Sequence, residues 1–434
     1  MKRALALIGL AAGIAVAAYV ALTRTDDAPG TAPALSGAPE SAAVLARGEY
    51  LAKAADCTAC HTVPESGMPF AGGVAFKLPF GTIYSTNITP DPEYGIGGWS
   101  DEAFVRAVRE GVGRHGEHLY PAFPYTSYTQ LSRGDVLAIK AYLMSLRPIA
   151  RKNRANDLRF PFDQRWAVGF WNALFFKDQR FAPDASKPAP WNRGAYLATA
   201  LGHCAECHTP RNFAFGLERS RDLEGAELQG WRAYNITSDA KFGIGSWSDA
   251  ELTRYLQTGL AAGHASAGGP MGEAVAHSLQ FLDDGDIAAL VAYLRTVPGR
   301  TGTHPVDVDR SPAPVMASSD TMPGPGDAPA HPDGLKLFEG ACASCHQWNG
   351  QGQLSQYAAL LGTRGVNDAD GANVTEAILH GVNMRIGGRQ VFMPAFGGAY
   401  SNSEVAALAN YVIAHFGGKS GQVTPEKVAE RRNL

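Results

Sequence analysis

All six cysteines of this chain lie in three copies of one pattern: CTACH at 57–61, CAECH at 204–208 and CASCH at 342–346. Two cysteines three positions apart lie on one side of a helical turn, where both can form thioethers with the two vinyl groups of a porphyrin. The histidine that follows is held beneath the iron as its proximal ligand. The pattern therefore predicts three haem c groups, attached through Cys57, Cys60, Cys204, Cys207, Cys342 and Cys345, with His61, His208 and His346 as proximal ligands.

Other readings of a single C-x-x-C-H are half of a zinc site and a redox cysteine pair. A structural zinc site needs a second pair of ligands. No cysteine remains outside the three copies, so neither that pair nor a disulfide is available from cysteine. Three copies, each with helical patterns before and after it, favour covalent haem at every site.

The sixth iron ligand decides what a haem can do. A methionine thioether raises the reduction potential, and it also fills the site so that the haem carries electrons instead of binding a substrate. In c-type domains this methionine lies on a loop before the last helix. Met393 lies eight residues before Ser401, and Met271 lies eleven residues before Leu282, so we predict both as sixth ligands. Met384 lies on a more distant loop and is expected to be a packing residue.

The corresponding loop of the first copy, 115–125, contains Phe123 where a methionine is expected. His118, thirteen residues before Leu131, is the candidate sixth ligand of the first haem. The alternatives are another methionine or histidine, or no protein ligand at all. A first haem with two histidine ligands should have a lower potential than its methionine-ligated neighbours, which suits the place where electrons enter a downhill relay.

Internal repeats show which elements must position these ligands. NITPDPEYGIGGWSDEAFVRAVREGVG at 87–113 matches NITSDAKFGIGSWSDAELTRYLQTGLA at 235–261, so two copies of one domain are present. The third copy is more distant and lies between 334 and 412. Apolar residues at helical spacing flank each copy, and Ser248-x-x-Glu251 and Ser401-x-x-Glu404 indicate capping boxes.

No segment shows sustained strand alternation, so we expect an all-α chain of three tandem cytochrome c-type domains. An aromatic-rich linker should contain a short helix that packs on a neighbouring domain or a partner, and a second linker is rich in proline and glycine. The expected boundaries are 1–25 for a signal or membrane anchor, 41–147, 191–298 and 333–418 for the domains, 148–190 and 299–332 for the two linkers, and 419–434 for a C-terminal tail.

The N-terminus is basic at Lys2 and Arg3 and then mostly small or apolar from Ala4 to Leu22. Such a start predicts export, and the apolar run is long enough to span a bilayer, so it is either an uncleaved anchor or a cleaved signal. The rest of the chain should then lie on the periplasmic side of the inner membrane. The 434 residues carry a net charge of −3, which gives no support for nucleic-acid binding.

The chain resembles the three-haem cytochrome c subunits of bacterial membrane-bound periplasmic dehydrogenases that oxidise alcohols, aldehydes, gluconate or sorbitol. The resemblance covers nearly the whole chain from Arg47. The motifs that carry it are the three C-x-x-C-H sites, FGTIYSTNITPD at 80–91, GIGGWSDEAF, LYPAFPYTSY, WNRGAYL at 191–197, GHCAECHTPRN at 202–212 and MPAFGGAYS.

The resemblance implies an electron-transfer subunit without substrate chemistry of its own. Its partner would be a catalytic subunit of the molybdenum, quinoprotein or flavoprotein type, and the electrons would pass to ubiquinone or to a downstream cytochrome or oxidase. Many relatives have methionine at the place of Phe123, whereas the aldehyde-oxidising molybdenum type has phenylalanine, which favours a molybdenum-dependent partner. The alternatives are a peroxidase-like haem enzyme at an open first haem, with His115 and His118 as acid–base groups, and a free-standing electron shuttle.

Overall fold

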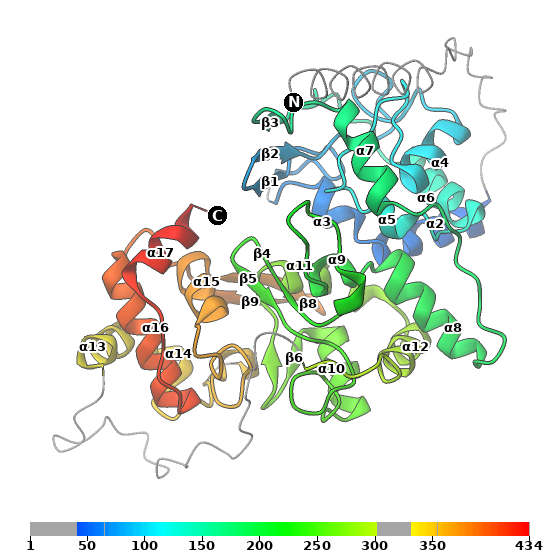
Figure 1. Cartoon of the computed structure of the whole chain (residues 1–434). Coiled ribbons are helices and arrows are strands. Elements are labelled where there is room, and N and C mark those ends of the chain that lie inside the picture. The colour runs from blue at the N-terminus through cyan, green and yellow to red at the C-terminus, as the bar shows by residue number, and fades with distance from the viewer. Residues whose placement is uncertain (1–40, 65, 302–330, 354, 434) are drawn as a thin grey trace, which may run out of the picture. The chain divides into compact units, whose positions relative to one another are not determined.

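The computed structural model describes residues 41–64, 66–301, 331–353 and 355–433, which divide into two compact units (Figure 1). The first unit contains the described residues up to 49 and residues 63–180, and the second contains 50–62 and 181–433. We call the three predicted domains region 1 (41–147), region 2 (191–298) and region 3 (333–418). Regions 2 and 3 lie wholly in the second unit, whereas region 1 is divided between the two.

The first unit consists of helices around one small antiparallel sheet with the strand order β1-β2-β3. Its elements are α2 (Ala42–Ala54, which continues into the second unit), β1 (Ala75–Leu78), β2 (Gly81–Tyr84), α4 (Asp101–Glu110), α5 (Tyr125–Tyr128), α6 (Arg133–Ser145), β3 (Asp157–Leu158) and α7 (Trp166–Phe175).

The second unit contains most of the helices and three two-stranded hairpins. Its elements up to residue 298 are α3 (Cys57–His61), α8 (Ala189–Tyr196), a π-helical turn (Leu197–Leu201), α9 (Ala205–His208), a 3₁₀ turn (Arg219–Arg221), β4 (Ala226–Leu228), β5 (Trp231–Ala233), α10 (Asp249–Thr258), β6 (Leu260–Ala261), β7 (Ala265–Ser266), α11 (Gly269–His277), a 3₁₀ turn (Leu279–Phe281) and α12 (Asp284–Leu294). Those of the C-terminal part are α13 (Pro332–Ala341), α14 (Ala343–His346), a 3₁₀ turn (Gln356–Ala358), α15 (Ala372–His380), β8 (Val382–Ile386), β9 (Arg389–Met393), α16 (Asn402–Gly417) and α17 (Pro425–Arg432).

In each region the helix before C-x-x-C-H crosses the last helix at a glycine. A Cβ atom on Gly48 would lie 1.9 Å from the carbonyl oxygen of Ala138, and one on Gly194 would lie 1.8 Å from that of Ala289. In region 3 the corresponding distance, from Gly334 to the oxygen of Ala407, is 2.3 Å. A tyrosine one turn further along the last helix packs beside each glycine; the three are Tyr142, Tyr293 and Tyr411. Any larger residue would force the two helices apart.

Short side chains begin the helices as the sequence predicts. The hydroxyl of Ser248 accepts a hydrogen bond from the backbone N–H of Glu251, and the Glu251 carboxylate accepts one from the N–H of Ser248. Ser401 and Glu404 form the same reciprocal pair at the start of α16. Both predicted capping boxes are therefore confirmed.

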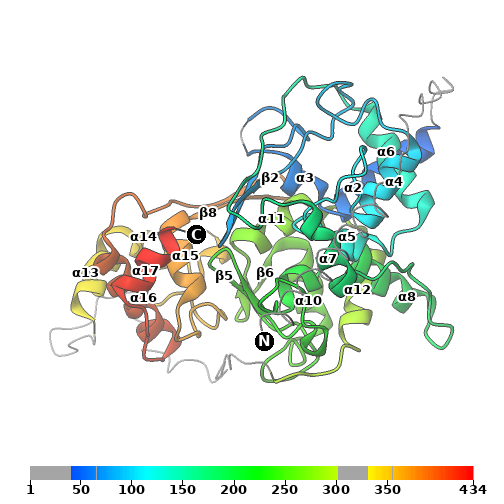
Figure 2. The same ribbon diagram turned by 45° about the horizontal axis from the view of Figure 1, so that its top comes forward.

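The expectation of an all-α chain overlooked the hairpins. The longest, β8–β9, pairs Val382 with Met393 and turns at Gly387 and Gly388, whose φ angles are 55° and 79°. Strands of five residues are too short to show sustained alternation, but the Gly-Gly pair is a hairpin signal because a tight turn of this kind needs positive φ at both positions. The hairpin belongs to region 3, and its strand β8 packs against α11 of region 2 (Figure 2).

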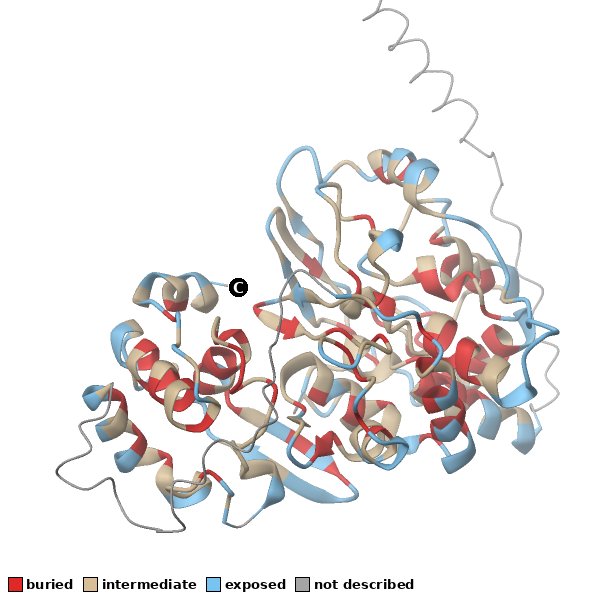
Figure 3. Cartoon of the chain, turned by 60° about the horizontal axis from the view of Figure 1, so that its bottom comes forward, coloured by how far each residue is buried: buried red, intermediate tan, exposed pale blue. Residues whose placement is uncertain are grey.

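The core of region 3 forms where α13, α15, α16 and α17 meet. Phe338, Val405, Ile413 and Val428 are each 0% exposed there, and the buried residues of the unit lie on the inner faces of the helices (Figure 3). The predicted C-terminal tail, 419–434, thus contains α17, a helix that packs on region 3. Region 2 has a smaller core around Leu252, Val291 and Leu294.

Within the described ranges, no helix is both long enough and apolar enough to cross a membrane. The predicted signal or anchor at 1–25 lies outside the described residues, as does most of the linker at 299–332. The aromatic-rich linker does contain the predicted short helix, α7.

Buried charges join regions 2 and 3. Arg232, 9% exposed, donates to Asp368 at 2.9 Å and to Asp370 at 2.7 Å. Glu376 is 1% exposed and lies 3.3 Å from the Arg431 guanidinium, which also donates to the carbonyl of Gly230. Burial raises the pKa of Glu376 to about 7, although the charge of Arg431 opposes the shift.

The crossing of α13 and α16 in region 3 can be tested with alanine substitutions at the two glycines of α13, Gly334 and Gly340. Gly334→Ala places a methyl group against the backbone of α16, so we expect it to lower the free energy of unfolding of the haem-loaded chain by about 1–3 kcal/mol in a denaturant titration. Gly340→Ala is the control, because a Cβ there has no neighbour within 4 Å. Alanine favours a helix over glycine, so this variant should be unchanged or up to about 1 kcal/mol more stable. Equal destabilisation by both variants would contradict the crossing.

Glu376 predicts a pH dependence. Its folded-state pKa lies above the unfolded value of about 4.3, so the stability it contributes is fully present below that value and is lost as the pH rises through about 7. Between about pH 5 and about pH 8 the wild type should therefore lose more stability than Glu376→Gln, by at most roughly 3 kcal/mol. Denaturant unfolding at the two pH values measures this difference. Glu339→Gln, on the exposed face of α13, should lose as much stability between the two pH values as the wild type. The same loss in Glu376→Gln would refute the raised pKa of Glu376.

Candidate haem-binding sites

The first C-x-x-C-H motif forms the short helix α3, which belongs to the second unit. Asp56 precedes it in a left-handed conformation with φ 53°, which aspartate tolerates better than most residues. Burial, reinforced by the charge of Asp56, raises the pKa of Cys57 and Cys60 to about 12. Both thiols are therefore neutral at neutral pH.

The other two motifs have the same design. Burial raises the pKa of Cys204 to about 11 and that of Cys207 to about 12, and it also raises that of Cys342, to about 11. None of the six cysteines forms a disulfide. Attachment of haem through all six therefore stays a prediction of the sequence, with which the free thiols are consistent.

Main-chain carbonyls orient the second and third proximal histidines. Nδ1 of His208 lies 2.6 Å from the carbonyl oxygen of Tyr234, and Nδ1 of His346 lies 2.6 Å from that of Ala358. A carbonyl can only accept, so Nδ1 carries the proton and Nε2 presents its lone pair to a metal. Burial also lowers the pKa of both histidines. A neutral, oriented imidazole is what haem iron requires, so these residues fit the group.

Gly269, two residues before Met271, has a backbone conformation that favours glycine. Gly269 has φ 50°, and a Cβ atom on it would lie 2.3 Å from the indole of Trp231. Met271 itself, at the start of α11, is half-buried against a cluster of Ala267, Val275, Met384 and Ile386. Met384 is 5% exposed in this cluster, so its predicted packing role is confirmed, although it packs onto region 2 from the region 3 hairpin.

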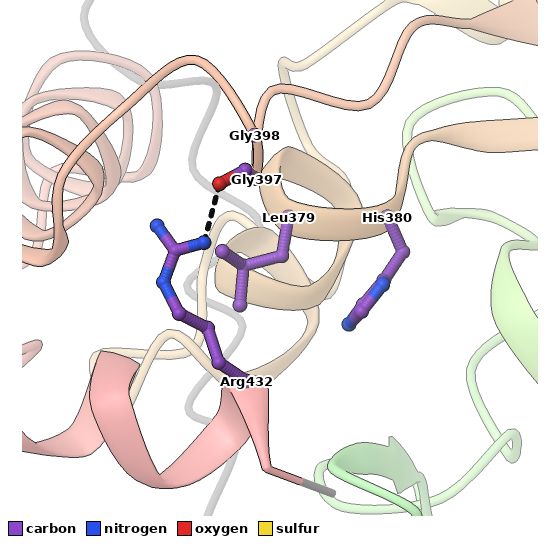
Figure 4. Close-up of a pocket in the computed structure, with 5 residues that line it drawn as sticks. All are labelled: Leu379, His380, Gly397, Gly398 and Arg432. Atoms are coloured by element: carbon purple, nitrogen blue, oxygen red, sulfur yellow. Dashed lines mark hydrogen bonds between the residues drawn. The ribbon is translucent and has the colours of Figure 1, made fainter.

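Met393 is the last residue of β9, and the loop after it is held by hydrogen bonds with two helices, α15 and α17. The N–H groups of Phe396 and Gly397 donate to carbonyls at the end of α15. From α17, the guanidinium of Arg432 donates to the carbonyl of Gly397 (Figure 4). It also donates to the carbonyl of Tyr400 and to the side chain of Asn402. The C-terminal helix therefore fixes the loop that carries the predicted sixth ligand.

His118 and Phe123 lie in the first unit. The carbonyl of His118 accepts a hydrogen bond from Arg165 at 2.8 Å, and its Nδ1 is buried without a hydrogen-bond partner among the described residues. Burial lowers the pKa of its ring. Phe123 packs edge-on against Tyr128 at 5.6 Å. A neutral imidazole with an unsatisfied nitrogen fits a metal ligand, but His61 belongs to the second unit, so their pairing on one iron stays a prediction.

Sequence reasoning missed the residues that hold the ligands in place. Arg432, Tyr234 and Trp231 act through contacts with loops distant in the chain, and no spacing rule identifies them. One sequence signal was available for the contact with Trp231: the glycine pair in Gly-Gly-Pro-Met, 268–271, since paired glycines beside a predicted ligand indicate a close approach to the backbone. The described residues contain no group of three or more histidine, cysteine or acidic side chains arranged to hold a metal ion.

Comparisons with known proteins identify the family of this chain. A family model for cytochrome c matches residues 45–147 and 332–414. The chain is 40% identical to the fructose dehydrogenase cytochrome subunit of Gluconobacter japonicus, over 89% of this chain and 82% of that one. It is 36% identical to the gluconate 2-dehydrogenase cytochrome c subunit of Pantoea cypripedii, over 90% of each.

A third relative is the cytochrome c subunit of the quinone alcohol dehydrogenase of Komagataeibacter europaeus, 33% identical over 98% of this chain and 89% of that one. The three relatives differ in the substrate named for their complexes and agree in the role of this subunit. The chain therefore belongs to the family of cytochrome c subunits of dehydrogenases, and it is an electron-transfer protein that carries haem c.

Proposed function

We propose that this chain carries three haem c groups and relays electrons from a dehydrogenase catalytic subunit to ubiquinone or another respiratory carrier at the periplasmic face of the inner membrane. The observation that carries the proposal is the threefold repetition of one scaffold. Each C-x-x-C-H helix follows a helix that crosses the last helix of its region at a glycine. Haem c supplies one-electron redox chemistry at each site.

Each haem is assigned a proximal and a distal residue. His208 and Met271 hold the second, and His346 and Met393 hold the third. Two methionine-ligated haems have no open position for a substrate, which supports a role in transfer over one in catalysis. His61 holds the first haem, with His118 as its proposed sixth ligand.

The relatives' names suggest the class of partner. Their complexes oxidise fructose, gluconate or an alcohol, so the proposed partner is a periplasmic catalytic subunit that removes electrons from a hydroxyl- or carbonyl-bearing compound. Its cofactor would be molybdenum, a quinone or a flavin. The substrate is selected in that partner and leaves no trace in this chain.

Helix α7 supports association with the membrane surface. Trp166, Phe170 and Leu174 lie four residues apart on one helical face and are 51%, 38% and 76% exposed. Phe160, just before the helix, is 80% exposed. Exposed basic residues flank the segment, namely Arg159, Arg165 and Lys177. Aromatic side chains within a basic rim suit the interface of an anionic bilayer, so we assign this face to lipid and not to a neighbouring domain.

Copurification tests the relay. The chain, tagged beyond Leu434 through a flexible spacer, should fractionate with membranes and, after mild detergent extraction, bring a larger redox subunit with it. Three haems per chain should be measured by haemochrome absorbance, and substrate of the partner should reduce them. Recovery of the chain alone, with peroxide turnover or stoichiometric carbon monoxide binding, would favour a haem enzyme. Release without detergent would favour a diffusing shuttle.

The first haem is tested through His118. If this residue is the sixth ligand, His118→Gln should remove one low-spin signal from the low-temperature EPR spectrum and leave the other two unchanged. His115→Gln, three residues away and exposed, is the matched control and should match the wild type. Identical spectra for the two variants would exclude His118. In that case a changed spectrum of Phe123→Met would still show that the loop reaches the iron.

A further inference from the structure

Arg364 is a buried arginine of region 3 whose contacts lie in region 2. It is 6% exposed. Its guanidinium donates to the carbonyl oxygen of Asn235 at 3.1 Å and to that of Phe242, and its backbone N–H donates to the carbonyl of His264 at 2.8 Å. A charged side chain at such depth, donating to main-chain carbonyls of another region, holds that backbone in one conformation.

The backbone that Arg364 holds is the one that orients the second proximal histidine. The guanidinium carbon lies 4.9 Å from the centre of the Tyr234 ring. The carbonyl of this tyrosine accepts the Nδ1 proton of His208 at 2.6 Å, and the next carbonyl, that of Asn235, accepts from Arg364. The side chain of Asn235 ties the same loop to the carbonyl of Arg300 at 2.7 Å. The backbone at Tyr234 and Asn235 is thus held by Arg364 through the Asn235 carbonyl and by Arg300 through the Asn235 side chain.

Region 3 also holds the other end of Tyr234. The phenol donates to the Asp368 carboxylate at 3.3 Å, and Asp368 pairs with Arg232. In region 1 the side chain of Asn87 takes the place of Asn235, because it donates to the carbonyls of Ile149 and Arg151. The contact from Arg364 adds to that shared arrangement in region 2. Region 3 therefore supplies part of the proximal structure of region 2.

The positive charge of Arg364 also acts on this site. Ferric haem carries one more positive charge than ferrous haem, and a buried cation nearby disfavours the ferric state more strongly than it would in water. The charge pairs around it, Arg232 with Asp368 and Lys427 with Asp370, balance one another. Loss of the Arg364 charge should therefore make the local environment more negative.

We propose that Arg364 is a positioning residue for the haem of region 2, which fixes the backbone next to the carbonyl that orients His208 and raises the reduction potential of that haem. The inference rests on the proposed function, because it requires a haem at Cys204 and Cys207. It implies that docking of region 3 sets the potential of region 2, so the middle step of the relay depends on the two regions being joined.

Spectroelectrochemical titration of the full-length, haem-loaded chain tests this role. The second haem is identified as the one whose midpoint potential moves in Met271→His. Arg364→Met removes the charge and the hydrogen bonds, so it should lower that midpoint alone. Arg364→Lys keeps the charge but lacks the two separate guanidinium nitrogens that reach the two carbonyls, so its midpoint should lie between those of Arg364→Met and the wild type. Arg254→Met removes an exposed charge from α10 of the same region and should leave all three midpoints unchanged.

The outcomes separate the inference from the function it rests on. Absence of haem on the 204–208 peptide of the wild type, measured by mass spectrometry, would overturn the function proposed for that site. Full haem loading with an unmoved second midpoint in Arg364→Met would overturn only the role of Arg364. If Arg364→Met does not accumulate, the EPR signal of the second haem in Arg364→Lys decides: an altered signal supports positioning, and an unchanged one refutes it.

Discussion

The closest approach of two helices in each region is the contact on which the other features depend. At Gly48, Gly194 and Gly334 one helix lies directly on a carbonyl of the last helix of its region, at distances that no side chain could occupy. This crossing fixes the direction from which each chain enters its C-x-x-C-H turn. It also fixes the start of the last helix, before which the predicted sixth ligands lie. Three regions of divergent sequence share this one contact, and in regions 2 and 3 a shift of either helix would displace the predicted ligands.

A second constraint is the removal of charge from the places where haem attaches. Burial raises the pKa of the Cys57, Cys60, Cys204, Cys207 and Cys342 thiols and lowers that of the His208 and His346 imidazoles, so it favours the neutral form of both kinds of group. Neutral thiols do not repel one another, and a neutral imidazole can donate its lone pair to iron. Hydrogen bonds from His208 and His346 to main-chain carbonyls complete the arrangement, because they select the tautomer without introducing a charge.

Charge is instead concentrated where regions 2 and 3 meet. Arg232, Arg364 and Glu376 are each less than 10% exposed there. The two arginines have partners in the other region, and Glu376 pairs with Arg431 of α17, whose guanidinium donates to the carbonyl of Gly230 in region 2. Buried charges of this kind tolerate little displacement, since separating a pair leaves an uncompensated charge in a poorly polarisable environment. The β8–β9 hairpin adds apolar contact with region 2 through Met384. Regions 2 and 3 therefore share a buried interface, and under the proposed function region 3 contributes to the environment of the second haem.

The sequence by itself predicted the chemistry, through the attachment cysteines, the proximal histidines and the sulfur ligands Met271 and Met393, and it determined the capping boxes at Ser248 and Ser401. These features are local, because a helical turn or a cap needs residues only three or four positions apart. The tertiary structure alone decided that α17 fastens the segment after Met393, that the β8–β9 hairpin packs against region 2, and that Arg364 holds the backbone at Asn235. These contacts join residues more than a hundred positions apart in the case of Arg364, and no periodicity in the sequence encodes such a distance. Only folding, which brings the buried faces together to exclude water, determines which of the chain's many arginines lies beside a haem ligand.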